Sequence, residues 1–261
     1  RCALVTGVQT CALPIWPQTY NAWDDKDTEG IDIMLTMDVS ASMLTEDVYP
    51  NRMVVAKEVA SEFISGRPND NIGLTIFAGE AFTQCPMTLD HAALLNLLHG
   101  VRTDLVTSGL MQDGTAIGMG LANAVSRLKD SKAKSKIVIL LTDGSNNAGS
   151  ISPMTAAAIA RKFGIRVYTI GFGKETGEEI GAIDYKTLQD IAVSTNGEFY
   201  RAQSQAELSR IYQDIDKLEK TKMNARSYSH LHEAYIPFAW LALLILCLDL
   251  LLRWTVFRRL P

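Results

Sequence analysis

The stretch Ile31–Met43, IDIMLTMDVSASM, opens with apolar residues at alternate positions and few polar interruptions. Such a run predicts a strand that is buried on both faces of a sheet. The strand ends at Asp38, and Ser40 and Ser42 follow at alternate positions of the next loop. Clustered oxygen ligands on a turn suit a hard divalent cation. On this stretch alone, a metal-binding loop and a plain polar turn are both open.

The composition allows one large domain with appendages. The chain has 261 residues, and the 47% that are hydrophobic support a sizeable core. The net charge of -4 provides no basic footprint for nucleic acid, which argues against that class of partner.

The first residues differ from the rest of the chain. Val5–Ile15, VTGVQTCALPI, resembles the translation of a common sequencing-library adapter. We therefore expect residues 1–15 to be an artefact and exclude them from the fold. A degenerate signal-peptide remnant is the alternative, but the segment lacks a start Met and an unbroken apolar region. The natural N-terminus is then expected to be missing, and the polar, acidic residues 16–30 are expected to form a linker.

Strands and helices are predicted to alternate after this point. Further strands are expected at residues 71–77, 80–85, 136–142, 165–171 and 197–201. Helices are expected at residues 52–64, after a cap at Asp90, at 116–128, 153–164 and 185–194, and after a capping box at Ser204. The short link between the second and third strands predicts an antiparallel hairpin. The alternation predicts an α/β fold with a doubly wound, mostly parallel, six-stranded sheet.

Two carboxylates are predicted to meet at one edge of this sheet. The usual doubly wound order places the first and fourth strands side by side, and ligands bind at their carboxyl ends. Asp38 ends the first strand and Asp143 follows the fourth. Adjacent carboxylates repel unless one takes a proton or a cation joins them. Asp113-Gly114-Thr115, just before a helix, adds a hydroxyl group.

These three loops resemble, in order and context, the metal-ion-dependent adhesion site of von Willebrand factor A domains. The resemblance implies such a domain over residues 31–222 and the metal ligands Asp38, Ser40, Ser42, Thr115 and Asp143. It implies that the hydroxyl groups coordinate directly and the carboxylates act largely through water. It also implies Mg²⁺ or another divalent cation, with an open position that a partner's carboxylate fills.

The C-terminal part carries a candidate membrane segment. Ile236–Leu252 is almost wholly apolar and is flanked by aromatic residues. At about 1.5 Å per residue it extends about 25 Å, slightly short of the roughly 30 Å bilayer core, and flanking residues can lengthen it. We expect a transmembrane helix at residues 236–254 after a juxtamembrane linker at 223–235. A buried core helix is the alternative.

Charged residues around this segment predict its orientation. Asp249 lies four residues before Arg253, which favours local pairing, although contact with another membrane helix is also open. Three arginines follow the apolar run closely, so the positive-inside rule predicts a basic cytoplasmic tail at residues 255–261. The domain is then expected in the periplasm, anchored to a bacterial inner membrane.

The assembled features resemble the BatA group of bacterial aerotolerance proteins, over Pro17–Pro261. The features that carry this resemblance are Trp23-Asp24, DVSASM, Pro50-Asn51-Arg52, QDGTAIGMGLANAV, LLTDGSNN and FRRLP. The resemblance implies partners among other Bat-type membrane proteins and a MoxR-type AAA ATPase, and a role in envelope or oxidative stress. It also implies membrane helices before Pro17.

Three functions are considered for such a chain. The first is a non-enzymatic, metal-dependent protein-interaction module. The second is a chelatase-like or cofactor-insertion subunit that works with the ATPase. The third is a Mg²⁺-dependent phosphohydrolase with Asp38 as nucleophile, but that class needs a second carboxylate two residues on, where this chain has Ser40. We therefore expect no enzymatic activity.

Overall fold

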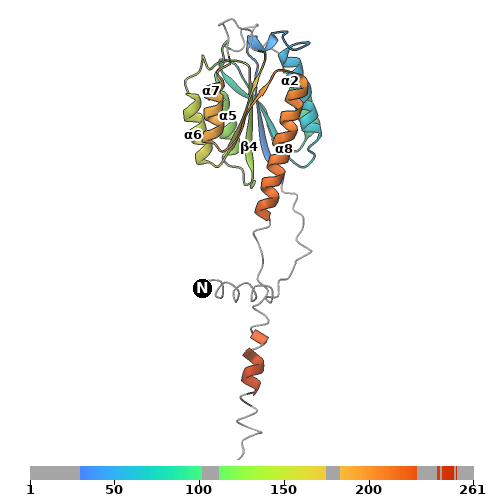
Figure 1. The fold of residues 1–261 in the computed structure, drawn as a ribbon, viewed down its shortest axis with the longest axis vertical. Coiled ribbons are helices and arrows are strands. Elements are labelled where there is room, and N and C mark those ends of the chain that lie inside the picture. Colours follow the sequence, from blue (N-terminus) through green and yellow to red (C-terminus); the bar gives the residue numbers. More distant parts are fainter. Residues whose placement is uncertain are drawn as a thin grey trace, which may run out of the picture. The chain divides into compact units, whose positions relative to one another are not determined.

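The first predicted strand is β1, Asp32–Asp38, and all of its side chains are buried. β1 lies near the middle of a six-stranded sheet with the order β3-β2-β1-β4-β5-β6 (Figure 1). The other strands are β2 (Asn71–Phe77), β3 (Ala81–Thr88), β4 (Lys136–Thr142), β5 (Arg166–Phe172) and β6 (Phe199–Ala202). This computed structural model describes residues 30–101, 112–174, 183–227, 240–241, 243–249 and 251.

The sheet is mostly parallel, as the alternating pattern predicts. β1 pairs in parallel with both β2 and β4, which confirms that the first and fourth strands are neighbours. β2 and β3 form the one antiparallel pair of this sheet, in agreement with the predicted hairpin. The winding of the chain therefore reverses between β1 and β4, where the carboxyl ends of both strands reach the same edge.

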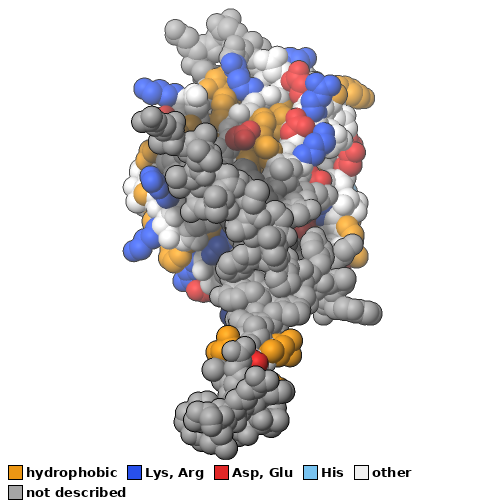
Figure 2. Space-filling model, turned by 60° about the horizontal axis from the view of Figure 1, so that its bottom comes forward, with side chains coloured by type: hydrophobic (Ala, Val, Ile, Leu, Met, Phe, Trp, Pro, Cys, Tyr) orange, Lys and Arg blue, Asp and Glu red, His pale blue; other side chains and the backbone are white. Residues whose placement is uncertain are grey.

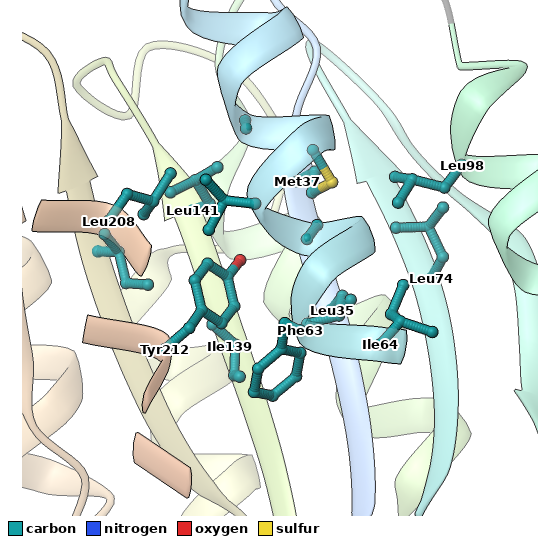
Figure 3. Packing of buried hydrophobic residues seen from close by; sticks show 14 of the residues in the cluster. Leu35, Met37, Phe63, Ile64, Leu74, Leu98, Ile139, Leu141, Leu208 and Tyr212 are labelled. Carbon is teal, nitrogen blue, oxygen red and sulfur yellow. The ribbon is translucent and has the colours of Figure 1, made fainter. Parts of the chain in front are cut away.

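Helices cover both faces of the sheet because successive side chains of a strand point to opposite sides. On one face of the sheet, Leu35 and Met37 of β1 lie under α2 (Arg52–Ser65), and Ile139 and Leu141 of β4 lie beside α8 (Gln205–Ser227) (Figure 3). The opposite face packs against α5, α6 and α7. The helices are α2 (Arg52–Ser65), α3 (His91–His99), α5 (Ile117–Leu128), α6 (Pro153–Lys162), α7 (Tyr185–Ser194) and α8 (Gln205–Ser227).

Side-chain caps explain where several of these helices begin. Asn51, Asp90, Ser152 and Asp184 each accept a hydrogen bond from the backbone amide three residues further on. A capping side chain satisfies one of the amides that a helix leaves without a partner at its N-terminus. The caps at Asp90 and Ser152 confirm the predicted helix starts.

The structure describes only part of the C-terminal segment for which a transmembrane helix was predicted. Among the described residues, no helix is both long enough and apolar enough to cross a membrane. Residues 236–239, 242, 250 and 252–254 of the predicted span lie outside the described residues, as do residues 1–29. Within the span, the described residues 240–241, 243–249 and 251 are helical.

Charges on the surface are mixed in sign. On the face drawn in Figure 2, described Lys and Arg side chains are interspersed with Asp and Glu. A nucleic-acid interface would need basic residues gathered on one face or along one helix. The described part of this face therefore does not carry charge of a single sign.

A buried glutamate fastens α8 to the sheet. Glu219 is fully buried and accepts hydrogen bonds from Ser135, Arg166 and Tyr168. Burial and the hydrogen bond to Glu219 raise the pKa of Tyr168. A buried carboxylate is tolerated because it is paired and hydrogen-bonded.

We expect Glu219→Ala to lower the free energy of unfolding by about 3–5 kcal/mol, because it leaves the Arg166 charge without this partner. Urea unfolding followed by circular dichroism measures the change. Asp214→Ala on the same helix is the control, since Asp214 pairs with Lys217 at the surface and such pairs contribute about 1 kcal/mol or less. Equal effects of the two substitutions would contradict the prediction.

Candidate metal centre

The carboxyl edge of the sheet brings together three loops that are distant in sequence. Asp38 is the last residue of β1, and Ser40 and Ser42 follow it around the short 3-10 helix η2, Ala41–Leu44. Asp143 directly follows β4, and Thr115 lies two residues before α5. The predicted site residues therefore come from the β1 loop, the β4 loop and the start of α5.

Hydrogen bonds join the first two loops. The Ser40 and Ser42 hydroxyl oxygens are 3.0 Å apart, and the Ser42 hydroxyl donates to Oδ1 of Asp143 at 2.8 Å. Asp38 accepts from the Ser40 amide at 2.9 Å and from the Thr142 hydroxyl at 2.7 Å. Asp38 and Asp143 are fully buried, whereas Ser42 is exposed. The two carboxylates of the cluster are thus buried, and the hydroxyl group of Ser42 lies at the surface.

Thr115 reaches the cluster through the backbone of the β4 loop. A Cβ on Gly144 would lie 3.2 Å from the Thr115 hydroxyl oxygen, so this hydroxyl lies directly beside the residue that follows Asp143. Asn147 fixes the position: its side chain accepts from the Thr115 amide at 2.7 Å, and its own amide donates to the Thr115 carbonyl at 3.0 Å. All five predicted residues therefore belong to one end of the sheet.

Burial and mutual repulsion govern the two carboxyl groups. Burial and the neighbouring charge of Asp143 raise the pKa of Asp38 to about 7. Burial also raises the pKa of Asp143, although hydrogen bonds from Ser42 and Arg52 act in the opposite direction. Two such groups are stabilised in their ionised form when a cation lies between them.

The donor set fits a small, hard cation. Mg²⁺ binds oxygen atoms at 2.0–2.1 Å in an octahedron, so that neighbouring ligand oxygens are about 3 Å apart. The serine hydroxyl oxygens are 3.0 Å apart and the Ser42 hydroxyl is 2.8 Å from Asp143; these are hydrogen-bond distances, and they are compatible with that spacing. Among the described residues, no group of three or more His, Cys, Asp or Glu side chains could hold a metal ion, so a site at this edge would depend on the hydroxyl groups as well as the two carboxylates. Hydroxyl and carboxylate oxygens favour Mg²⁺ over softer metals.

Arg52 is a member of this cluster to which sequence analysis assigned no role. Its Nη1 donates to Oδ2 of Asp143 at 2.8 Å, and its Nε and Nη2 donate to the two carboxylate oxygens of Asp47, each at 2.8 Å. Burial opposes ionisation of Asp47, but hydrogen bonds from Arg52 and the Lys174 amide outweigh it and lower its pKa. In the sequence, Arg52 stood out only as part of the Pro50-Asn51-Arg52 run of the resemblance and as the first residue of a helix, five residues after Asp47.

Comparison with known proteins supports the fold. The sequence model of the von Willebrand factor type A domain matches residues 32–214. An uncharacterized protein of Borreliella burgdorferi is 29% identical over 83% of this chain, and a UPF0353 protein of Mycolicibacterium paratuberculosis is 31% identical over 70%. The chain spans 67% and 59% of the lengths of these two relatives.

Solved structures extend the comparison. BatB from Bacteroides thetaiotaomicron is 29% identical with a TM-score of 0.62, over 73% of this chain and 100% of that one. An aerotolerance-related membrane protein from Bacteroides fragilis is 27% identical with a TM-score of 0.61, over 72% and 98%. Proximal thread matrix protein 1 from the mussel byssus, whose metal-ion-dependent adhesion site is occupied by zinc, is 27% identical with a TM-score of 0.60, over 73% and 46%.

Proposed function

Because this chain belongs to the von Willebrand factor type A domain family and resembles Bat aerotolerance proteins, we propose that it is a metal-dependent protein-interaction module. Its metal ligands are Asp38, Ser40, Ser42, Thr115 and Asp143. The bound ion is Mg²⁺ or another divalent cation, and a carboxylate of a partner protein completes its coordination. The chain acts by binding and not by catalysis.

The convergence of the two serine hydroxyls on the buried Asp143 carboxylate carries this proposal. The serine hydroxyls and Thr115 provide neutral ligands, and Asp38 and Asp143 provide the compensating charge. When bound, the cation supplies an electrophilic point that attracts an anionic group. Since Ser42 is exposed, the open side of the site faces solvent, where a partner can approach.

The surroundings of Asp38 support a binding role over phosphoryl transfer. Both of its carboxylate oxygens accept hydrogen bonds, and its side chain is fully buried. A nucleophile must instead be reachable by the substrate, which the burial of Asp38 opposes. The acid-base position two residues later holds Ser40, which has no titratable group near neutral pH.

The cellular setting is proposed from the relatives and the C-terminal sequence. One related solved protein, from Bacteroides fragilis, is described as a membrane protein, and residues 236–254 have the apolar composition of a membrane anchor. We place the domain in the periplasm of a bacterium, the anchor in the inner membrane and residues 255–261 in the cytoplasm. The proposed partners are other Bat-type membrane proteins and a MoxR-type AAA ATPase, in a complex that responds to envelope or oxidative stress.

A chelatase-like or cofactor-insertion subunit working with that ATPase is the alternative, and metallocofactor levels in a deletion strain would separate the two.

Crosslinking in native membranes tests the proposal. We expect the unaltered chain to capture a defined partner with Mg²⁺ present and to lose it with a chelator. Thr115→Val removes one hydroxyl ligand with little change in side-chain shape, so we expect capture to fall about 10-fold or more. Thr36→Val is the matched control, because Thr36 is a buried threonine within β1 whose hydroxyl has no hydrogen-bond partner among the residues that the structure describes. Capture that is insensitive both to the chelator and to Thr115→Val would refute the interaction function.

A further inference from the structure

A buried arginine lies directly behind the metal ligand Asp143. Asp143 presents Oδ1 to the Ser42 hydroxyl and Oδ2 to Arg52, so its two oxygens serve different neighbours. The guanidinium is nearly enclosed, with 8% of the residue exposed, and Asp47 binds it on the far side through both carboxylate oxygens. Positive and negative groups thus alternate outward from the proposed cation: Asp143, Arg52, Asp47.

We propose that Arg52, held in place by Asp47, sets the charge of the metal centre so that cation binding by the chain alone is weakened and binding of the partner's anionic group is strengthened. This inference rests on the metal site proposed above and deepens it. It assigns Arg52 and Asp47 as positioning residues, which act on the metal through Asp143 and do not touch it.

The first argument concerns coordination. With Oδ2 engaged by Arg52 at 2.8 Å, only Oδ1 of Asp143 is turned toward the serine hydroxyls. Asp143 is therefore limited to one oxygen, directly or through water, and cannot bind a cation with both. A coordination position that a bidentate carboxylate would fill is left for the partner.

The second argument concerns charge. Asp38 and Asp143 would balance a divalent cation, but the positive charge of Arg52 offsets one of these carboxylates. The inner part of the loaded site then carries about one unit of positive charge, which an anionic ligand neutralises. Asp47 lies beyond Arg52, so its negative charge reduces this excess only in part.

The backbone around Arg52 holds the guanidinium where it is. Gly173 has a φ of 146°, and a Cβ there would lie 2.6 Å from Cζ of Arg52, so only glycine allows this close approach. The Lys174 amide donates to Asp47 at 2.8 Å and ties the loop after β5 to the same ion pair. Arg52 thus also joins three loops, and an experiment must separate this structural role from the electrostatic one.

Two substitutions that break the same ion pair make that separation. Arg52→Met removes the positive charge behind Asp143, so we expect Mg²⁺ to bind about tenfold more tightly. Asp47→Asn removes the negative charge that offsets Arg52, so we expect Mg²⁺ to bind about threefold more weakly. Titration calorimetry of the purified full chain with MgCl₂ at about pH 8 measures both. A purely structural clamp would weaken binding in both variants.

A carboxylate probe provides the second readout. Acetate is titrated into the Mn²⁺-loaded full chain, and displacement of water from Mn²⁺ is followed by water proton relaxation. We expect acetate to bind Arg52→Met about tenfold more weakly than the unaltered chain, because the excess positive charge is gone. Acetate affinity unchanged in Arg52→Met would overturn the inference.

Arg67→Met is the matched control. Arg67 is also buried and also bridges two aspartates, Asp70 and Asp216, but it lies between the end of α2 and the start of β2, at the opposite edge of the sheet. We expect Arg67→Met to destabilise the chain about as much as Arg52→Met and to leave its Mg²⁺ affinity unchanged. A change in Mg²⁺ affinity equal to that of Arg52→Met would overturn the inference.

The remaining outcomes are also decisive. Failure of the unaltered chain to bind Mg²⁺ would overturn the metal site and this inference together. If the unaltered chain binds Mg²⁺ and Arg52→Met binds it more weakly, the inference about Arg52 is overturned and the metal site stands. If Arg52→Met does not fold, Asp47→Asn decides the question. We then expect Asp47→Asn to bind Mg²⁺ more weakly and acetate more strongly than the unaltered chain. Any other result for Asp47→Asn would overturn the inference.

Discussion

Asp38→Ala is expected to lower Mg²⁺ affinity about 100-fold and to abolish Mg²⁺-dependent capture of the partner. The substitution removes one of the two buried carboxylates that balance the cation, and losses of this size follow the removal of groups that orient metal ligands. Titration calorimetry with MgCl₂ measures the affinity, and crosslinking in membranes measures capture.

The fold should survive this substitution. Asp38→Ala leaves the Ser40 amide and the Thr142 hydroxyl without their acceptor, at a cost of about 1–3 kcal/mol for each buried group, but it also removes a buried carboxyl group that burial and Asp143 disfavour in its ionised form. Asp38→Asn retains an oxygen acceptor and provides a milder version of the same test. Both should retain the circular dichroism of the unaltered chain.

Asp32→Ala is the control for this experiment. Asp32 is a buried aspartate at the other end of β1, about 20 Å from Asp38 for a strand rise of about 3.3 Å per residue. Its carboxylate accepts from Asn71 and Ser131 and has no part in the metal centre. We expect Asp32→Ala to reduce stability and to leave Mg²⁺ affinity unchanged. If Asp38→Ala bound Mg²⁺ as tightly as the unaltered chain, the proposed metal site would be wrong.

Without metal, the chain should become less stable as the pH rises from about 4 to 7. The pKa of Asp38 is raised from 3.8 to about 7, so over this range the folded state holds a proton that the unfolded state has released. Stability from such a group is complete below the unfolded pKa and is lost as the pH rises through the folded pKa. At about 1.4 kcal/mol per pKa unit, the loss amounts to at most about 4 kcal/mol.

Saturating Mg²⁺ should remove most of this loss, because a cation takes the place of the proton between the carboxylates. Urea unfolding midpoints at several pH values, with EDTA and with MgCl₂, measure the effect. Asp38→Asn cannot titrate and should show a much smaller slope in EDTA. A slope of the same size in Asp38→Asn would mean that another group is responsible.

Strand order was predictable because it depends on the pattern of the whole chain. Buried runs at residues 31–38 and 136–142 alternate with helical segments, and right-handed crossovers leave few ways to order the strands. Asp38 and Asp143 end these two runs, so their approach followed from topology before any contact was known. The hairpin of β2 and β3 followed in the same way from its short link.

Arg52 and Asp47 were not predictable in this way. Asp47 lies in an irregular loop and Arg52 at the first position of a helix, and many charged residues at such places are simply solvated. Their pairing with Asp143 depends on how that loop folds back, and on a glycine after β5 that leaves room for the guanidinium. Such contacts depend on distances of a few ångströms between loops, which no local pattern encodes.

By itself, then, the sequence determined the α/β sheet and the neighbourhood of β1 and β4, and through a family resemblance it predicted five oxygen ligands at that edge, because hydrophobic periodicity and motif order are properties of the chain alone. Only the tertiary structure decided how those ligands are spaced, that the two carboxyl groups are wholly buried, and that a guanidinium lies behind one of them. Burial and electrostatic interaction arise between segments far apart in sequence, and they exist only once the loops have converged.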